Sequence, residues 1–146
     1  MKAKELMIGD WVHIDEQDKY AGATGQIQSL MYHREDDAAY FNVFIQGKFG
    51  YVSRDVCSDD IRPIHLTADI LEKNGFENIG DDTYQLEEKP CWFWVDFFRH
   101  TYGCEYDTST YEYEDDEHRL KLYGIPSVHE LQHALRLCGI EKEIEL

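Results

Sequence analysis

The chain has 146 residues, of which 42% are hydrophobic and 14% aromatic, and its 30 Asp and Glu against 14 Lys and Arg give a net charge of −16. This apolar content suffices for the core of one ordinary domain or two very small ones and argues against a disordered chain. The negative field repels nucleic-acid phosphates and anionic membrane surfaces, so we expect no direct nucleic-acid binding and no membrane association.

The first 65 residues predict a β-rich part. Alternating polar and apolar residues, interrupted by glycine turns at 22–25 and 47–50, indicate four short strands. We place these strands at 11–14, 26–30, 40–45 and 51–53, with a polar loop at 33–37. Short strands at this spacing are typical of a small curled sheet or an SH3-like barrel.

A short helix is predicted to follow. Thr67 is a good N-cap, and Asp69 lies in the first turn, where the helix dipole favours a negative charge. Leu66 and Leu71 have the spacing of a hydrophobic staple. Gly75 suits the left-handed position that ends many helices.

The remaining residues predict a smaller mixed part. A turn at 80–82 precedes an aromatic strand at 92–98, and residues 119–123 alternate as a further strand. An acidic loop or strand edge is expected at 111–117, and a helix at 128–138 closes the chain. The fold class is therefore α+β, with a β-rich part at 1–65 and an α+β part at 66–146 that form two domains or one compact unit.

Aromatic residues gather in the second part. The strand at 92–98 is apolar on both faces, so it must be covered twice, by helices or by a second copy of the chain, which predicts a homodimer. Core packing accounts for most such rings, and a partner-binding surface is the alternative, because Trp and Tyr concentrate at interface hot spots. The set comprises Trp92, Trp94, Phe97, Phe98, Tyr102, Tyr106, Tyr111 and Tyr113.

Residues 129–133 read H-E-x-x-H, which is the zinc pattern of metalloproteases. On a helix, His129 and His133 lie one turn apart on one face and can reach the same Zn²⁺. Glu130 would then act as general base on the metal-bound water. No other motif in the sequence indicates a specific reaction.

The same residues also predict a helix start. Ser127 and Glu130 have the Ser-x-x-Glu spacing of a capping box, in which each side chain accepts from the other residue's backbone N–H. His129, His133 and Arg136 would then share an outer polar face, opposite a buried apolar stripe. The stripe comprises Val128, Leu131, Ala134, Leu135 and Cys138.

A third zinc ligand has no defined place in the sequence. The extended H-E-x-x-H-x-x-G-x-x-H pattern needs Gly and His where the chain has Arg136 and Gly139. His100, His118 or Cys104 could fold back as a ligand, although no spacing argues for any of them. We therefore favour the capping box, and we expect no catalytic residue, no metal and no cofactor.

Three further patterns carry weaker signals for a site. Cys91, His100 and Cys104 could belong to a soft-metal set, but their spacing matches no zinc finger or ribbon. The acidic run at 112–117 lacks the central glycine of an EF-hand loop. The glycine turn at 22–25 lacks the lysine of a P-loop, and no serine lies in a nucleophile elbow. We interpret these patterns as core thiols, a solvated loop and a turn.

Cysteine usage indicates a reducing compartment. The four cysteines, at positions 57, 91, 104 and 138, form no C-x-x-C pair. Residues 1–6 show no apolar stretch of the kind a signal peptide needs, and no apolar run reaches the length of a membrane span. We therefore expect reduced thiols in a cytoplasmic protein.

Three blocks of the sequence resemble segments of one protein family, and they occur in the same order as in that family. They are KAKEL (2–6) with IGDWV (8–12), RPIHLT (62–67) with ILEKNGF (70–76), and VHELQ (128–132). These blocks are similar to a group of small uncharacterised bacterial proteins common in prophages and other mobile elements of gut anaerobes. His65 replaces a proline usual in that group, and His133 stands where the group commonly has Asn. The resemblance implies no activity, and it makes the second histidine of the H-E-x-x-H string a departure from the family pattern.

We therefore expect a non-enzymatic accessory or interaction protein of a prophage or mobile element, whose partner is another protein or a second copy. Residues 1–66 hold 7 basic and 11 acidic residues, whereas residues 67–146 hold 7 and 19. This charge suits a first alternative, an acidic mimic that occupies a nucleic-acid-binding site on a host protein. The second alternative is a zinc-dependent hydrolase that uses His129, Glu130 and His133.

Overall fold

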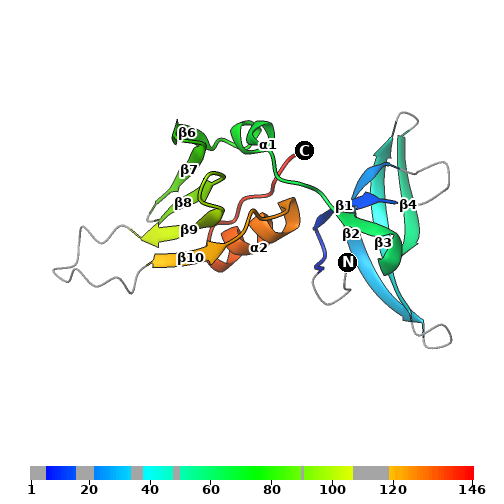
Figure 1. Cartoon of the computed structure of the whole chain (residues 1–146). Coiled ribbons are helices and arrows are strands. Elements are labelled where there is room, and N and C mark those ends of the chain that lie inside the picture. Colours follow the sequence, from blue (N-terminus) through cyan, green and yellow to red (C-terminus); the bar gives the residue numbers. More distant parts are fainter. Residues whose placement is uncertain (1–5, 16–21, 34–37, 48–49, 90, 107–118) are drawn as a thin grey trace. The chain divides into compact units, whose positions relative to one another are not determined.

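The computed structural model describes residues 6–15, 22–33, 38–47, 50–89, 91–106 and 119–146. The chain divides into two compact units, Met1–Ile64 and His65–Leu146 (Figure 1). Strands dominate both units and helices are few, so the protein has the predicted α+β class with a C-terminal helix. The division falls beside the predicted boundary at residue 65, and independent folding of the two parts stays a prediction. The predicted acidic loop at 111–117 lies outside the described residues.

Where the structure describes the first unit, it is one antiparallel sheet of five strands. The strands are β1 (Trp11–Ile14), β2 (Thr24–His33), β3 (Ala38–Gly47), β4 (Gly50–Cys57) and β5 (Ile61–Pro63), and a 3₁₀ turn (Ser58–Asp60) joins the last two. Their order is β4-β3-β2-β1-β5, so β1 pairs with both β2 and β5. The four predicted strands are confirmed, and all except β1 extend beyond their predicted bounds.

Strand alternation builds the core of the first unit. Along β1, Val12 and Ile14 are fully buried, whereas Trp11 is only half-buried. A register shift between Ile27 and Ser29 marks a bulge in β2, and a bulge bends its strand. The buried cluster comprises Leu6, Val12, Ile14, Ile27, Phe41, Val43, Ile45, Val56 and Ile61.

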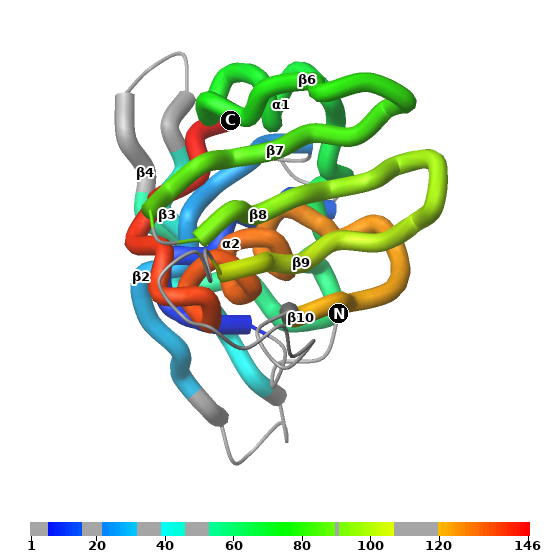
Figure 2. Tube along the Cα trace, turned by 90° about the vertical axis from the view of Figure 1, so that its left-hand side faces the viewer, coloured from blue at the N-terminus to red at the C-terminus, as the bar shows by residue number. Residues whose placement is uncertain are grey.

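The described residues of the second unit form a five-stranded antiparallel sheet and two helices. In chain order it contains α1 (Ala68–Lys73), β6 (Glu77–Gly80), β7 (Thr83–Glu88), β8 (Cys91–Asp96), β9 (Thr101–Tyr106), β10 (Arg119–Tyr123) and α2 (Val128–Leu137). Strands that follow one another in the chain are neighbours in the sheet, in the order β10-β9-β8-β7-β6. Two views at right angles show α2 against one face of this sheet (Figure 1, Figure 2).

The predicted helix after Thr67 is confirmed, and Thr67 caps its first turn through its side chain. At the other end, Gly75 has a φ of 79°, and its N–H donates to the Glu72 carbonyl at 3.0 Å. The Phe76 N–H donates to the Leu71 carbonyl, also at 3.0 Å. This is the Schellman arrangement, in which glycine takes the left-handed position without a steric cost.

Strand β8 separates two sets of side chains. Cys91, Phe93 and Val95 are buried, whereas Trp92 and Trp94, on the opposite face, are half-buried. The buried side chains share their face with the part of β9 that contacts the end of α2. Helix α2 therefore supplies one of the two covers that the sequence predicts for this strand.

Asp96 ends β8 two residues earlier than predicted. Its carboxylate accepts from the Arg99 N–H at 2.7 Å and pairs with the Arg99 guanidinium at 2.9 Å. His100 in the same turn has a φ of 51°. The prediction that the strand continues to residue 98 is wrong, because this turn takes Phe97 and Phe98 out of the ladder.

The last residues of the chain pack back on the two helices of the second unit. Ile144 is buried, and Glu143 accepts from Gln132 Nε2 at 2.6 Å. The Asn74 side chain donates to the Glu145 carbonyl and accepts from the Glu145 N–H, each at 2.8 Å. Asn74 thus bonds to the tail as a residue of a neighbouring strand would, and it joins α1 to the C-terminus.

Candidate functional site

Helix α2 begins within the residues of the H-E-x-x-H string, with a capping box formed by Ser127 and Glu130. Glu130 Oε2 accepts from the Ser127 N–H at 2.7 Å and from the Ser127 O–H at 2.8 Å. The carboxylate is therefore engaged at the helix start, where the helix dipole also favours its negative charge.

His129 lies inside the protein rather than on its outer face. It is 4% exposed, and its Nδ1 is 2.8 Å from Ser127 Oγ. Ser127 Oγ is therefore a hydrogen-bond partner of both the Glu130 carboxylate and the His129 ring. The prediction of a polar outer face is wrong for this residue, because its ring folds back toward the helix start, where Ser127 is its partner.

The two histidines of the string lie next to each other. The rings of His129 and His133 meet edge to face with their centroids 5.8 Å apart, and His133 is half-buried. Of the predicted third ligands, His100 is exposed on the β8–β9 turn, Cys104 is buried in the core, and His118 lies outside the described residues. Within the described ranges, no three His, Cys, Asp or Glu residues form a group that could hold a metal ion.

The charge state of Glu130 agrees with its structural role. Burial raises the pKa of its carboxyl group, but the hydrogen bonds from Ser127 and the electrostatic attraction of the neighbouring His129 and His133 outweigh burial, so the pKa lies below its usual value. Burial, and then the negative charge of Glu130, raise the pKa of the Tyr102 hydroxyl. A general base works best with a pKa near the working pH, so Glu130 is poorly suited to that task.

Three thiols meet in the core of the second unit. Cys104 Sγ and Cys138 Sγ are 2.7 Å apart, and Cys91 is buried with them. Burial, and then the charge and hydrogen bond of Cys104, raise the pKa of Cys91 to about 12. Burial likewise raises the pKa of Cys138. The predicted set of Cys91, His100 and Cys104 therefore has Cys138 in place of the histidine, and its protonated thiols behave as small core residues.

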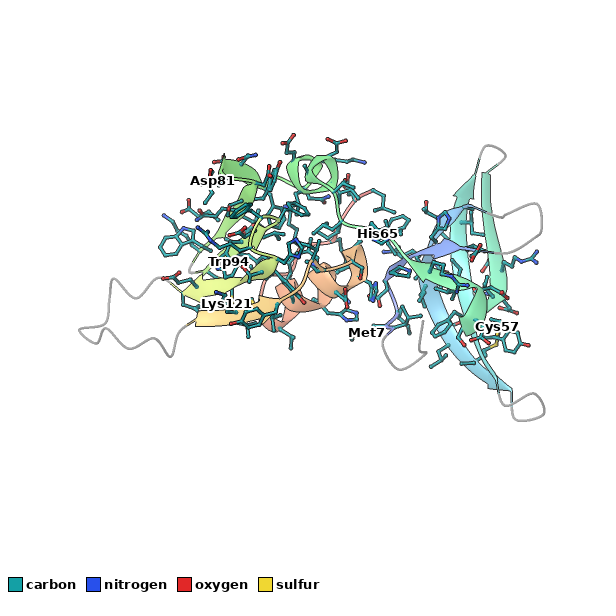
Figure 3. All side chains as sticks on the ribbon, viewed as in Figure 1. Met7, Cys57, His65, Asp81, Trp94 and Lys121 are labelled. Carbon is teal, nitrogen blue, oxygen red and sulfur yellow. The ribbon has the colours of Figure 1, made fainter. Side chains whose placement is uncertain are left out.

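The face of the second sheet opposite α2 is hollowed. Trp92 and Trp94 both point to this face from β8. The hollow is a shallow, open depression with a volume of about 520 Å³. Figure 3 labels Trp94 and Lys121, which lie on β8 and β10 and line the hollow together. Its lining residues are Ile79, Thr83, Gln85, Trp92, Trp94, Asp96, Arg99, Thr101, Glu105 and Lys121.

Strand register orders this face in three rows across β7, β8 and β9. The rows are Glu87, Trp92, Glu105; then Gln85, Trp94, Gly103; then Thr83, Asp96, Thr101. Directly opposite residues of antiparallel strands point to the same face, so the side chains of each row stand together. The first row combines an indole ring with two carboxylates. In the last row, Arg99 balances the charge of Asp96 at 2.9 Å.

The other rings of the aromatic set do not extend this face. Phe97 packs edge to face on a neighbouring tyrosine, and the Tyr106 hydroxyl donates to the backbone at the end of α2. Phe98 is 76% exposed on the turn after β8. Tyr111 and Tyr113 lie outside the described residues.

The polar members of the rows were missed by the sequence analysis because it predicted neither β7 nor β9. The alternation of polar and apolar residues at 83–87 is the signal that could have identified β7. It would have placed Thr83, Gln85 and Glu87 on one face, beside the tryptophans of the next strand.

Comparison with known proteins adds no relative: no family model, curated protein or solved structure matches the chain. The helices of the described part are all too short or too polar to cross a bilayer. The function must therefore be inferred from the arrangement of the residues themselves.

We expect Glu130→Gln to weaken the start of α2 in a pH-dependent way. A carboxyl group whose pKa falls on folding stabilises the protein above its unfolded pKa of ~4.3, and this contribution is lost as the pH falls through the folded pKa. The variant should lose about 1 kcal/mol of unfolding free energy at neutral pH and approach the parent chain in strong acid, as measured by urea denaturation. Glu141→Gln, which removes an exposed carboxylate from the tail, is the control and should match the parent chain throughout. A difference that stays constant with pH would contradict the capping role.

Proposed function

We propose that the chain is a non-enzymatic accessory protein of a prophage or other mobile element, which acts in the cytoplasm by binding another protein through the hollowed face of its second sheet. The observation that carries this proposal is the position of Trp92 and Trp94, half-buried on the face of β8 opposite α2. An antiparallel sheet usually presents polar side chains on its solvated face. Two tryptophans in such a place favour a binding role, because Trp is enriched among the residues that dominate interface energies.

The start of α2 supports a binding role over zinc-dependent hydrolysis. Glu130, which would be the general base, is bonded to Ser127 and has a lowered pKa. His129 is buried, and its Nδ1 is hydrogen-bonded to the hydroxyl group of the same serine. Zinc-dependent catalysis would therefore require the capping box to open.

The strands and turns of the first unit support the SH3-like assignment within this proposal. Small antiparallel barrels are built from short strands joined by tight turns. The unit has β5-β1-β2-β3-β4 with the turn at Ser58–Asp60. Such small barrels commonly serve as interaction modules, which agrees with an accessory role.

The acidic-mimic alternative rests on the same surface and on the charge around it. Residues 67–146 contain 19 acidic and 7 basic residues, so the second unit carries most of the negative field. A field of this sign speeds encounter with basic proteins and repels a second copy of the same chain. Both the accessory role and the mimic role therefore require a protein partner, and the mimic role further requires that the partner bind nucleic acid.

Metal analysis tests the hydrolase directly. Protein purified without a His-tag from medium that contains zinc should hold zinc well below one equivalent, because His129 and Glu130 are both bonded to Ser127 at the helix start. Stoichiometric zinc that is lost in His133→Ala but kept in His100→Ala would contradict the proposal.

Capture from a bacterial host lysate tests the binding face. The full chain should retain a partner that Trp92→Ala and Trp94→Ala release, whereas Phe98→Ala, which removes an exposed ring outside the hollow, should leave capture unchanged. Circular dichroism checks that each variant is folded. Equal capture by all three variants would contradict the proposed face.

A further inference from the structure

The row of Glu87, Trp92 and Glu105, of which Trp92 and Glu105 line the hollow, has a geometry that suits one kind of ligand. Glu87 and Glu105 stand directly opposite Trp92 on the two neighbouring strands. Opposite residues of antiparallel strands have their Cβ atoms ~5 Å apart, so a carboxylate flanks the indole ring on each side. Glu87 and Glu105 are exposed and Trp92 is half-buried, so all three reach the surface.

We propose that the partner bound by this face presents a basic segment, and that one of its Arg or Lys side chains lies over the Trp92 ring between Glu87 and Glu105. This proposal rests on the proposed function and names the chemistry of the partner. The face of an indole ring attracts cations more strongly than that of any other side chain. A guanidinium can stack on the ring and also bond to a carboxylate in a bidentate manner.

The protein's own cations surround this row. Arg119 stands opposite Glu105 on β10, and Lys121 lines the hollow, so a basic ligand must share or displace their contacts there. Lys89 Nζ is 3.8 Å from Glu87 Oε1, but its side chain is 82% exposed, and such a surface pair is weak and readily exchanged. Arg99 is held by the buried carboxylate of Asp96 at the other end of the hollow. Glu105 has an interaction within the chain, so a ligand would exchange a contact there rather than fill a vacancy.

Charge complementarity selects a basic segment over the other possible occupants. The excess of acidic residues in 67–146 attracts a cationic partner from a distance and repels a second copy of the chain or an acidic ligand. An uncharged ligand could pack against the two tryptophans, but it would form no ion pair with the carboxylates that flank Trp92. The row should therefore bind a basic segment more tightly than a neutral one.

Titration with short synthetic peptides tests this proposal. The probes are an arginine-rich peptide and the same peptide with every arginine replaced by citrulline, which keeps the shape and removes the charge. Binding to the full chain is followed by tryptophan fluorescence and by the indole N–H signals in NMR spectra. The arginine peptide should bind and shift the Trp92 signal, and the citrulline peptide should bind at least about tenfold more weakly.

Matched variants locate the cation on the row. Glu87→Gln and Glu105→Gln should each weaken the arginine peptide about threefold to tenfold, because each removes one flanking carboxylate. Glu88→Gln makes the same charge change one residue away, in the register position opposite Cys91, and should leave affinity unchanged. Trp92→Phe should bind more weakly than the parent chain and more strongly than Trp92→Ala.

Distinct outcomes separate this proposal from the proposed function. Equal binding of the two peptides, or equal losses in Glu87→Gln and Glu88→Gln, would overturn the basic-segment assignment. Capture of the partner could instead require Trp92 and Trp94 but be unaffected by Glu87→Gln and by salt. That result would support the proposed binding face and contradict the proposal that its ligand is basic. Light scattering that shows a dimer dissociated by Trp92→Ala would instead assign the face to a second copy.

Discussion

The candidate site depends on the alternation of side chains along β8. Successive side chains point to opposite faces of the sheet, and α2 covers one of these faces. Cys91, Phe93 and Val95 fill the face that α2 covers, so the intervening tryptophans must point the other way. A shift of one residue in register would exchange the two sets and bury the indole rings. The buried set thus holds Trp92 and Trp94 in place without any contact to a ligand.

Local features of the fold were readable in the sequence because they depend on neighbours along the chain. Thr67 and Gly75 set the ends of α1 through their own backbone and side-chain bonds. Strand β10 was predicted at its observed bounds from alternation alone. At the start of α2, the spacing of Ser127 and Glu130 indicated the capping box, although the same residues also match a zinc pattern.

The parts that sequence reasoning missed depend on residues far apart in the chain. Trp92 and Phe93 are both large and apolar, so the sequence could not tell which face of β8 would meet α2. The burial of His129 was missed for a different reason, because its ring lies beside Ser127 at the helix start and helical periodicity does not report this local contact. The pairing of β7 and β9 with β8 places the carboxylates beside the tryptophan, and this pairing joins residues from three separate strands.

Hydroxyl-radical footprinting of the captured complex tests the central claim most directly, because it reports the exposure of individual side chains. With the partner bound, oxidation of Trp92 and Trp94 should fall strongly, whereas oxidation of the exposed Phe98 and of His133 on α2 should stay at the level of the unbound chain. Protection confined to α2 or to the first unit, with both tryptophans still oxidised, would contradict the assignment of this face as the binding surface.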